Sequence, residues 1–285
     1  MDHLVYQDLE SIIELLEISQ DDFAKAIGVS RVTVNNWCSK KTAISEKNIN
    51  RIYEYAFDKG IRLNRIKEQI YLEDYIKKDE VLLFHGSKSG IDGKPDLNHN
   101  KRINDFGNGF YCGESLEQSA MFVATYPESC LYMLKFKYTG LRKRVLYVNR
   151  DWMLMVAYFR GKLKEYNNSD ILKKLLDENK GVDYFIAPIA DNRMFEIIDS
   201  FIDGEITDVQ CQHCLSATNL GNQYVFVSQK ALNQVVLLEK CYLGQAEKDS
   251  YLNARQECFK INQDKVKLAK KQYRNQGNYI EDILK

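Results

Sequence analysis

Two glycine-containing segments of the chain combine side-chain and backbone groups that could contact a ligand. The first is an apolar run from Val81 to Phe84 that leads directly into His85 and Gly86. The second is Phe-Gly-x-Gly-Phe-Tyr, which ends at Tyr111 and whose two close glycines let the backbone approach a ligand beside an aromatic ring. This second segment is not the dinucleotide-binding Gly-x-Gly-x-x-Gly motif, because no strand-to-helix turn surrounds it. A single histidine is usually a structural residue, so neither segment identifies a site alone.

Two further segments place polar groups at the boundaries of expected elements. One expected strand ends in Ala-Asp-Asn, where Asp191 or Asn192 could contact a ligand or could equally cap the helix that follows. Cys211, His213 and Cys214 form a Cys-x-x-Cys pair with a histidine inside it. A pair of this kind without a second pair rarely forms a zinc site, so we expect no metal.

The elements that must position these residues change in character near residue 80. After that point short apolar runs predict strands, and longer periodic segments predict helices. The expected strands cover 81–84, 131–138, 145–148, 182–189 and 223–227. Ser115 is expected to cap a helix that contains 117–122, and two further helices are expected over about 151–177 and over 193–202. The segment 204–222 is expected to be a loop that precedes the last of these strands. Strands and helices together predict an α+β domain over residues 79–245.

The two ends of the chain are expected to be helical. Within an N-terminal domain over 1–78, residues 8–76 show a helical period, with Ser19 and Ser30 placed to cap two short helices and Gly28 placed to end the first of them. Residues 246–274 contain neither Gly nor Pro and are rich in charged residues. They predict a solvated amphipathic helix in an extension over 246–285, which either packs on the rest of the chain or mediates a homodimer.

The composition of the whole chain excludes several classes of protein. The 285 residues are 45% hydrophobic and 28% charged, and 40 basic residues balance 40 acidic ones. These values are typical of a globular protein and argue against a polybasic coat, an acidic tail or a disordered chain. The sequence contains no run of 18 or more apolar residues, and its seven cysteines are scattered. We therefore expect a cytoplasmic protein with no membrane span and no disulfide framework.

The N-terminal part contains the motif Ser-Gln-x-x-Phe-Ala-x-x-Ile-Gly-Val-Ser-x-x-Thr-Val-x-x-Trp. Small Ala24 and apolar Val34 and Trp37 suit two helices that pack across a tight turn. The motif resembles the helix-turn-helix of the Xre/Cro/lambda-repressor family of DNA-binding domains, and the resemblance covers about residues 8–76. It implies that Ser30 to Trp37 is the recognition helix. The residues that it places at the DNA, within 19–41, are Arg31, Thr33, Asn35, Asn36, Lys40 and Lys41.

The local charge of this region agrees with DNA binding. Between residues 24 and 52 six basic residues stand against Glu46 as the single acidic one. Such an excess attracts the phosphate backbone. The alternative is a protein-interaction module that uses the same fold without touching DNA. The sequence departs from the family at Cys38-Ser39-Lys40-Lys41, where an acidic residue and a glycine are more usual.

Three segments of the second part, taken in order, are more informative than any one of them. They are Leu-Leu-Phe-His-Gly-Ser-Lys, then Phe-Gly-x-Gly-Phe-Tyr…Ser-Ala-Met-Phe, then Asn-Gln-Tyr-Val-Phe-Val. Together they resemble the three NAD-binding segments of the ADP-ribosyltransferase superfamily, in its diphtheria-toxin and poly(ADP-ribose)-polymerase branch. They are also similar to an uncharacterised bacterial family of that clan, often found behind helix-turn-helix domains. The resemblance covers about residues 81–240 and implies a split-sheet fold that takes NAD as substrate. It also implies that the loop over 204–222 helps to choose the acceptor, with 210–219 as specificity candidates.

The resemblance also implies roles for individual residues. His85 would hydrogen-bond a ribose hydroxyl of NAD, and the Gly86 backbone and the Ser119 hydroxyl would hold the nicotinamide carboxamide. Tyr111 and Phe122 would sandwich the nicotinamide ring, with Phe122 standing where the polymerases carry a tyrosine. The implied NAD-binding set is His85, Gly86, Ser87, Gly109, Tyr111, Ser119, Phe122, Asp191 and Asn192, and the implied catalytic set is His85, Tyr111 and Gln223.

Gln223 departs from the superfamily pattern, which has a catalytic glutamate at this place. An amide can hydrogen-bond the ribose 2′-hydroxyl, but it cannot accept a proton or stabilise positive charge. Three interpretations remain open. The acceptor is nucleophilic enough to need no base, another carboxylate such as Glu114, Glu117 or Asp191 takes the role, or the domain binds NAD without cleaving it.

These interpretations leave different functions for the chain. One is a mono-ADP-ribosyltransferase that modifies a protein or a nucleic acid, as a bacterial toxin or phage-defence effector that also binds DNA. Another is a transcriptional regulator that senses NAD or ADP-ribose. The third is a structural interaction module, which would bind neither NAD nor DNA.

Overall fold

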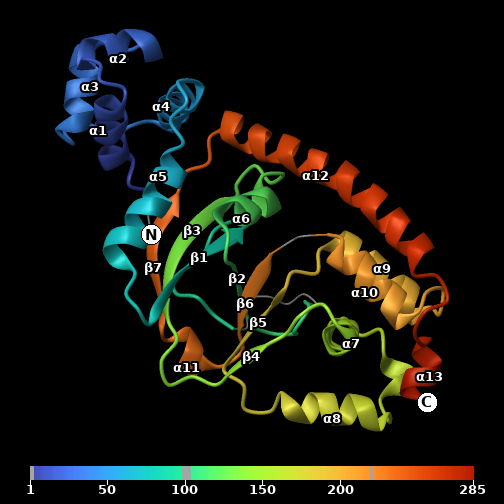
Figure 1. The fold of residues 1–285 in the computed structure, drawn as a ribbon. Helices are drawn as coiled ribbons and strands as arrows, with labels where there is room; N and C mark the ends of the chain where they lie inside the picture. Colours follow the sequence, from blue (N-terminus) through green and yellow to red (C-terminus); the bar gives the residue numbers. More distant parts are fainter. Residues whose placement is uncertain (1–2, 98–103, 219–220) are drawn as a thin grey trace. The chain divides into compact units, whose positions relative to one another are not determined.

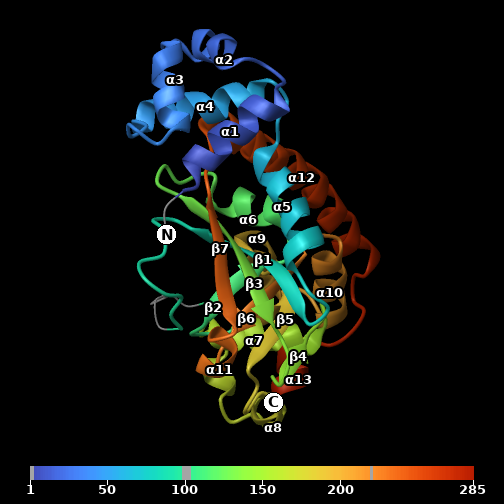
Figure 2. The same cartoon turned by 90° about the vertical axis from the view of Figure 1, so that its left-hand side faces the viewer.

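The computed structural model describes residues 3–97, 104–218 and 221–285. Its residues form two compact units, each assembled from segments that are distant in the sequence. The first unit consists of Met1–Gly93, Ser119–Phe136 and Val236–Ala254, and the second of Lys94–Gln118, Lys137–Val235 and Arg255–Lys285. Figures 1 and 2 show the chain from two directions.

The N-terminal helices of the first unit are bounded by the signals that the sequence contains. They are α1 Val5–Leu15, α2 Gln20–Ile27, α3 Arg31–Cys38, α4 Glu46–Asp58, α5 Leu63–Ile70 and the π-helical turn η1 Tyr71–Tyr75. The side-chain oxygens of Ser19 and Ser30 accept the backbone N–H groups of Asp22 and Thr33, each at 3.1 Å. Gly28 ends α2 with a φ of 72°. The two serine caps and the glycine end are therefore confirmed.

A small apolar core holds these helices together. Leu9 and Ile12 of α1, Phe23 of α2, and Val34 and Trp37 of α3 are all buried in this one cluster. Ala24 is buried as expected, because a larger side chain would not fit between two helices joined by a short turn.

A buried polar network connects these helices to strand β7, which covers Val235–Cys241. The ammonium group of Lys67 in α5 contacts Asp8 of α1 at 2.5 Å and also pairs with Glu239 of β7. Tyr53 of α4 donates its hydroxyl to Asp8, and Tyr71 donates to Glu239 at 3.1 Å. The two carboxylates are therefore compensated by one cation and two hydroxyl donors.

The strands form a mixed seven-stranded sheet. The order in the second unit is β4-β5-β6-β2, with bounds Lys143–Val145, Tyr184–Pro188, Asn222–Phe226 and Phe110–Gly113. The order in the first is β1-β3-β7, where β1 is Glu80–Ser87 and β3 is Cys130–Lys137. Strand β6 runs antiparallel to both β2 and β5, whereas β4 and β5 are parallel. The α+β fold class is confirmed.

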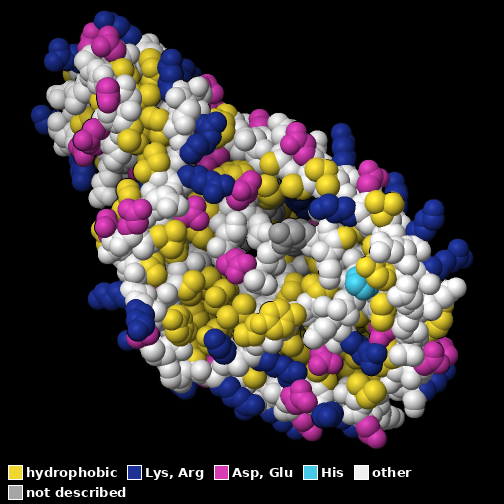
Figure 3. All heavy atoms as spheres, viewed as in Figure 1, with side chains coloured by type: hydrophobic (Ala, Val, Ile, Leu, Met, Phe, Trp, Pro, Cys, Tyr) yellow, Lys and Arg dark blue, Asp and Glu magenta, His cyan; other side chains and the backbone are white. Residues whose placement is uncertain are grey.

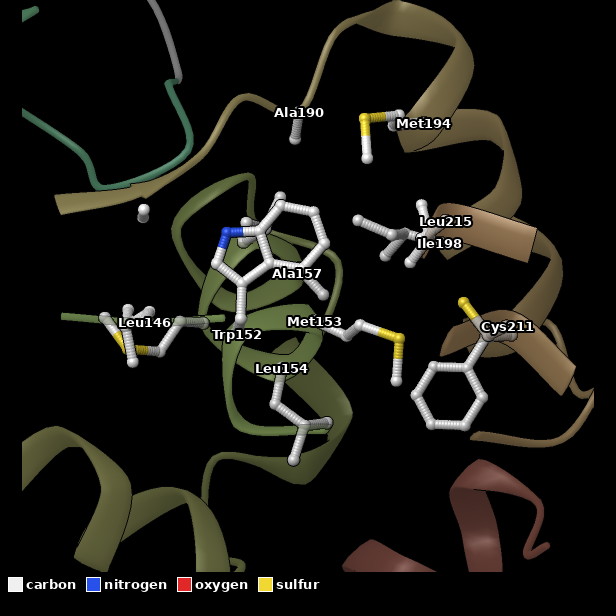
Figure 4. Close-up of a cluster of buried hydrophobic side chains, with 14 of the residues drawn as sticks. Leu146, Trp152, Met153, Leu154, Ala157, Ala190, Met194, Ile198, Cys211 and Leu215 are labelled. Atoms are coloured by element: carbon white, nitrogen blue, oxygen red, sulfur yellow. The ribbon is translucent and has the colours of Figure 1, made fainter. Parts of the chain in front are cut away.

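Helices in the second unit enclose a larger apolar core. They are α7 Arg150–Phe159, the 3-10 turn η2 Lys164–Tyr166, α8 Asp170–Glu178, α9 Asn192–Ile202, α10 Asp208–Ser216, α11 Gln229–Leu232 and α13 Ile280–Leu284. In Figure 4 the side chains of Trp152 and Met153 on α7 point toward Met194 and Ile198 of α9 and toward Leu215 of α10. Helix α6, Leu116–Val123, and the long helix α12, Gln245–Gln272, each have residues in both units.

Three expectations about this part of the chain were wrong in detail. The strand expected over 145–148 lies at Lys143–Val145, because the side chain of Asn149 caps α7 through the N–H of Trp152 and turns the chain out of the sheet. The helix expected over 151–177 is interrupted after Phe159, where Gly161 takes a φ of 76°. The expected loop over 204–222 contains α10, whose first turn is capped by Thr207.

Strand β7 was missed altogether, since the sequence was interpreted as ending its sheet at residue 227. Its run Val235-Val236-Leu237-Leu238 carries a strand signal of the ordinary kind. The helix expected over 246–274 is confirmed as α12. Within the described residues, none of the helices has the length and apolar character that crossing a membrane requires.

Candidate functional site

Helix α3 presents a polar face that suits the major groove of DNA. Arg31 and Asn35 are exposed, and Lys40 and Lys41 are exposed just after the helix ends. Arginine and asparagine are the side chains that pair with guanine and adenine edges. In the view of Figure 3, Lys and Arg side chains project from the helix-turn-helix region together with Asp and Glu side chains.

Three further residues of α3 refine the expected contact set. The hydroxyl of Thr33 lies 2.8 Å from that of Ser30, so it forms part of the helix cap. Asn36 is half-buried. Val32 is 67% exposed on the same helix. Sequence reasoning did not select Val32 because an isolated valine in a helical period is usually counted toward the core.

The end of β1 packs directly against α6 in the first unit. A Cβ atom on Gly86 would lie 2.7 Å from Cγ1 of Val123 and 2.8 Å from the backbone oxygen of Ser119. Ser119 is buried and donates its hydroxyl to the backbone oxygen of Phe84 at 3.4 Å. His85 is half-buried, with its ring 6.3 Å from that of Tyr132. His85, Gly86 and Ser119 are therefore brought together.

Two other residues of the implied NAD-binding set also lie in the first unit. Phe122 of α6 is 57% exposed, so most of its ring is open to a ligand or to solvent. Ser87 donates its hydroxyl to the backbone oxygen of Gly90 at 2.8 Å. Its hydroxyl therefore stabilises the turn that follows β1.

Tyr111 occupies β2 in the second unit and folds back on its own loop. Its hydroxyl donates to the backbone oxygen of Gly107 at 2.7 Å and accepts the N–H of Phe106 at 3.2 Å. Burial raises the pKa of this hydroxyl above its usual range. At Gly109 a Cβ would lie 2.8 Å from the backbone oxygen of Phe226, so that glycine permits close pairing with β6. The nicotinamide sandwich of Tyr111 and Phe122 involves residues of different units and stays a prediction.

Gln223 begins a buried network that no sequence motif indicated. Its Nε2 donates to Oδ2 of Asp105 at 2.9 Å and to the backbone oxygen of Pro188 at 3.1 Å. The same Oδ2 accepts the N–H of Ala190 at 3.1 Å. Arg160 donates Nε to Oδ1 at 2.9 Å, and its Nη2 also binds that oxygen. Asp105 and Gln223 are only 6% and 7% exposed.

This network fixes the orientation of the Gln223 amide. Both groups that contact Nε2 are oxygens that only accept, so the NH2 end of the amide must face them. Among the described residues no donor reaches Oε1, which leaves that oxygen as an acceptor. Gln223 therefore presents the same kind of atom as a glutamate would, without the charge.

Two other carboxylates near Gln223 have structural partners. Asp191 caps α9, since its Oδ1 accepts the N–H groups of Arg193 and Met194 at 3.1 and 3.0 Å. Glu114 is exposed, and its Oε1 accepts both the N–H and the side-chain amide of Asn222 at 3.0 Å. The backbone of Asn192 forms the first residue of α9.

The Cys-x-x-Cys pair lies in α10 and packs into the core. Cys211 donates its thiol to the backbone oxygen of Ile197, and Cys214 donates to that of Val266. Burial raises the pKa of both thiols, which disfavours the thiolate that a metal would need. His213 stacks on Tyr273 at 3.5 Å between ring centroids. Gln210, expected in a specificity loop, is buried and donates to the backbone oxygen of Lys270, while Asn219 lies outside the described residues.

Comparison with known families identifies both parts of the chain. Residues 9–55 match the helix-turn-helix family, so the chain carries a helix-turn-helix DNA-binding domain. Residues 81–237, more than half of the chain, match the family described as "Protein of unknown function (DUF3990)". The chain belongs to the DUF3990 family. Neither the curated proteins nor the solved structures gave a match.

The DUF3990 domain brings the sequence-predicted residues together in two groups. His85, Gly86 and Ser119 form one, and Tyr111 and Gln223 form the other on paired strands, where Gly113 is opposite Gln223. Sequence reasoning missed Asp105 and Arg160. A signal existed for Asp105, which directly precedes the Phe-Gly-x-Gly-Phe-Tyr segment, but nothing in the sequence pairs it with a residue 118 positions later.

Proposed function

We propose that the DUF3990 domain of this chain is an NAD-dependent mono-ADP-ribosyltransferase, in a bacterial toxin or defence effector whose helix-turn-helix domain binds DNA. The observation that carries the proposal is the packing of the His85-Gly86 end of β1 on Ser119 of α6. The resemblance requires these three residues to surround one nicotinamide-ribose group. Their adjacency is what such a pocket needs, and Gly86 allows it because, without a side chain, it lets β1 approach α6 closely.

The proposed reaction is a substitution at the anomeric carbon of the nicotinamide ribose. The bond from that carbon to the nicotinamide nitrogen breaks, and its electron pair neutralises the pyridinium. A nucleophilic oxygen or nitrogen of the acceptor forms the new bond and releases its proton to water. A site that holds the leaving group and the ribose contributes chiefly by positioning, and no metal is needed for this step.

The test is release of nicotinamide from NAD by the full chain, with and without cell extract as acceptor. We expect release and a labelled macromolecule when the NAD carries a label in its adenosine part. His85→Ala should lower release by about 100-fold, because it removes a positioning contact at the ribose. His213→Ala, which alters a histidine stacked outside the site, is the matched control. Absence of release by the unaltered chain under every acceptor condition would contradict the proposal.

The amide at residue 223 favours a second function, that of a regulator which senses NAD or ADP-ribose. The NH2 end of Gln223 is held by Asp105 and Pro188, so the side chain offers a hydrogen-bond acceptor but no charge. Calorimetry would then show ligand binding while nicotinamide release stays at background. The two functions are therefore separated by measuring binding and release on the same preparation.

DNA binding through α3 is tested by substitution of one exposed side chain. Asn35→Ala should weaken binding to a duplex selected from a random pool by about 1–3 kcal/mol, if the amide contacts a base edge. Asn253→Ala, at an exposed asparagine of α12, is the control. Fluorescence anisotropy of the labelled duplex gives both affinities. Equal affinities of the two variants would show that Asn35 does not face DNA.

A further inference from the structure

The carboxylate that residue 223 lacks is present one hydrogen bond away. Asp105 is buried beside Gln223, and its two oxygens have separate partners. Among the described residues, Oδ1 accepts from Arg160 alone, whereas Oδ2 accepts from Ala190 and Gln223. The negative charge therefore lies behind the amide, on the side away from Oε1.

A buried carboxylate in this position is costly unless it is fully bonded. Arg160 supplies the compensating charge, and its Nη2 also donates to the backbone oxygen of Ala190 at 2.7 Å. Its guanidinium lies 4.1 Å from the centre of the Phe195 ring, which fixes its plane. The network thus joins the residue that follows α7, the loop before β2, strand β6 and the chain that follows β5.

We propose that Asp105 is a positioning residue, which holds the Gln223 amide with its oxygen toward the substrate so that the Asp105–Gln223 pair takes the place of a single glutamate. This inference rests on the proposed function for the identity of the substrate, whose ribose hydroxyl would donate to Oε1. The pairing of the two side chains is testable without that substrate. The carboxylate reaches the ribose only through the amide.

Exchange of the carboxylate at residue 105 and the amide at residue 223 tests whether the two side chains are paired. Q223E alone places a second carboxyl against Asp105, and two buried carboxyls at hydrogen-bond distance share one proton. The introduced carboxyl then stays protonated at neutral pH and donates to Asp105, much as the amide does. The other charged or titratable groups around this pair are Arg160, which directly follows α7, Tyr111 of β2, Glu114, which bonds Asn222, and Asp191 before α9.

The first measurement is the melting temperature of the full chain between pH 4.5 and 8. In Q223E the folded-state pKa of the introduced carboxyl is raised above its unfolded value of about 4.3. The melting temperature of Q223E should therefore match that of the unaltered chain at low pH and fall increasingly below it as the pH rises. The double variant D105N/Q223E has one carboxylate again and should show no such pH-dependent loss. Q229E, at an exposed glutamine of the same unit, is the control and should also lack it.

D105N completes the double-mutant cycle. The Asn side chain can keep its oxygen toward Arg160 only by presenting NH2 to residue 223, and the Gln223 amide must then reverse. D105N also deprives the N–H of Ala190 of its acceptor, but this loss is common to D105N and the double variant and cancels in the cycle. Parallel pH profiles of Q223E and the unaltered chain would overturn the pairing.

The second measurement is nicotinamide release at pH 7. D105N should reduce release by about 100-fold, and chiefly in kcat, because a misplaced acceptor acts on the transition state. The double variant should release nicotinamide about tenfold faster than either single variant, or more, since it restores a charged acceptor at residue 223. Q223E equal to the double variant would overturn the positioning role. No release by any variant, with the pH-dependent loss present, would remove the ribose contact and the proposed function and leave only the pairing.

Discussion

At Gly86 the chain has no room for a side chain, and the reason is the neighbouring helix and not the backbone conformation. The nearest atoms to an added Cβ are Cγ1 of Val123 and the backbone oxygen of Ser119, at 2.7 and 2.8 Å. The side chain of Val123 is fixed in the core and the other contact is backbone, so neither can move aside cheaply. The close approach of β1 to α6 therefore depends on this one glycine.

Gly86→Ala should lower the free energy of unfolding by about 1–3 kcal/mol through overpacking. Gly244 gives a matched control in the same unit, since a Cβ there would meet its nearest atoms at 3.7 Å or more. Gly244→Ala should be neutral or should stabilise the chain by about 0.4–1 kcal/mol through the unfolded state. Urea denaturation of both variants measures the difference. An equal effect in both would show that α6 does not press on β1.

Asp191 shows that a residue can satisfy a simple structural role at a position where a ligand contact is also implied. The sequence left a helix cap and a ligand contact equally open, and the cap is formed through the N–H groups of Arg193 and Met194. A cap uses one carboxylate oxygen, and the other oxygen is paired with the Arg193 guanidinium at 3.2 Å. The ligand contact stays a prediction.

Among the elements, α5 and β7 are connected by a buried ion pair between Lys67 and Glu239. Lys67 is largely buried between Asp8 and Glu239. Burial by itself would lower the pKa of Lys67, but the two carboxylates outweigh it and raise that pKa above its usual range. The folded state thus favours the charged ammonium, so its contribution to stability is complete below the ordinary lysine pKa of about 10.4 and is lost only above it.

Lys67→Met should cost about 3–5 kcal/mol at pH 7.5, because it leaves two buried carboxylates without their cation. Part of that loss should be recovered near pH 5, where protonation removes the uncompensated charge. Lys267→Met is the control, since Lys267 pairs with Asp264 at an exposed site where about 0–1 kcal/mol is expected. Urea denaturation at the two pH values gives the result. A cost that does not change with pH would mean that the carboxylates are not left charged and buried.

The elements that the sequence predicted well are those with local signals. Ser19, Gly28 and Ser30 mark α2 and α3 through caps that involve residues four positions away or fewer. In contrast, the apolar run at 145–148 was assigned to a strand because periodicity cannot show that Asn149 starts a helix. The Asp105–Gln223 bond joins residues far apart in the sequence, and only the pairing of β2 with β6 brings their segments together. Local propensity contains no information about such a contact.

At the scale of the whole molecule, the first unit contains both the recognition helix and several residues of the implied NAD-binding set. His85, Gly86 and Ser119 belong to it, as does α3. The same unit contains the Lys67 network, which joins the N-terminal helices to β7 of the sheet that also includes β1. A ligand that alters the position of β1 could therefore act on α3 through β7, the Lys67 network and the N-terminal helices.

We expect DNA and ADP-ribose to alter each other's affinity, and thermodynamics fixes the form of the result. If ADP-ribose changes the affinity for a selected duplex by some factor, the duplex must change the affinity for ADP-ribose by the same factor. A coupling of about 1–3 kcal/mol corresponds to about 5–150-fold. Anisotropy of the labelled duplex with and without ADP-ribose, and calorimetry of ADP-ribose with and without the duplex, give the two values independently. Lys67→Met should reduce the coupling toward a factor of one while each ligand still binds alone, because it loosens the join between α5 and β7. If Lys67→Met leaves both affinity changes as they are in the unaltered chain, the coupling does not depend on the contact between α5 and β7. If neither ligand changes the affinity for the other in the unaltered chain, the two domains act independently.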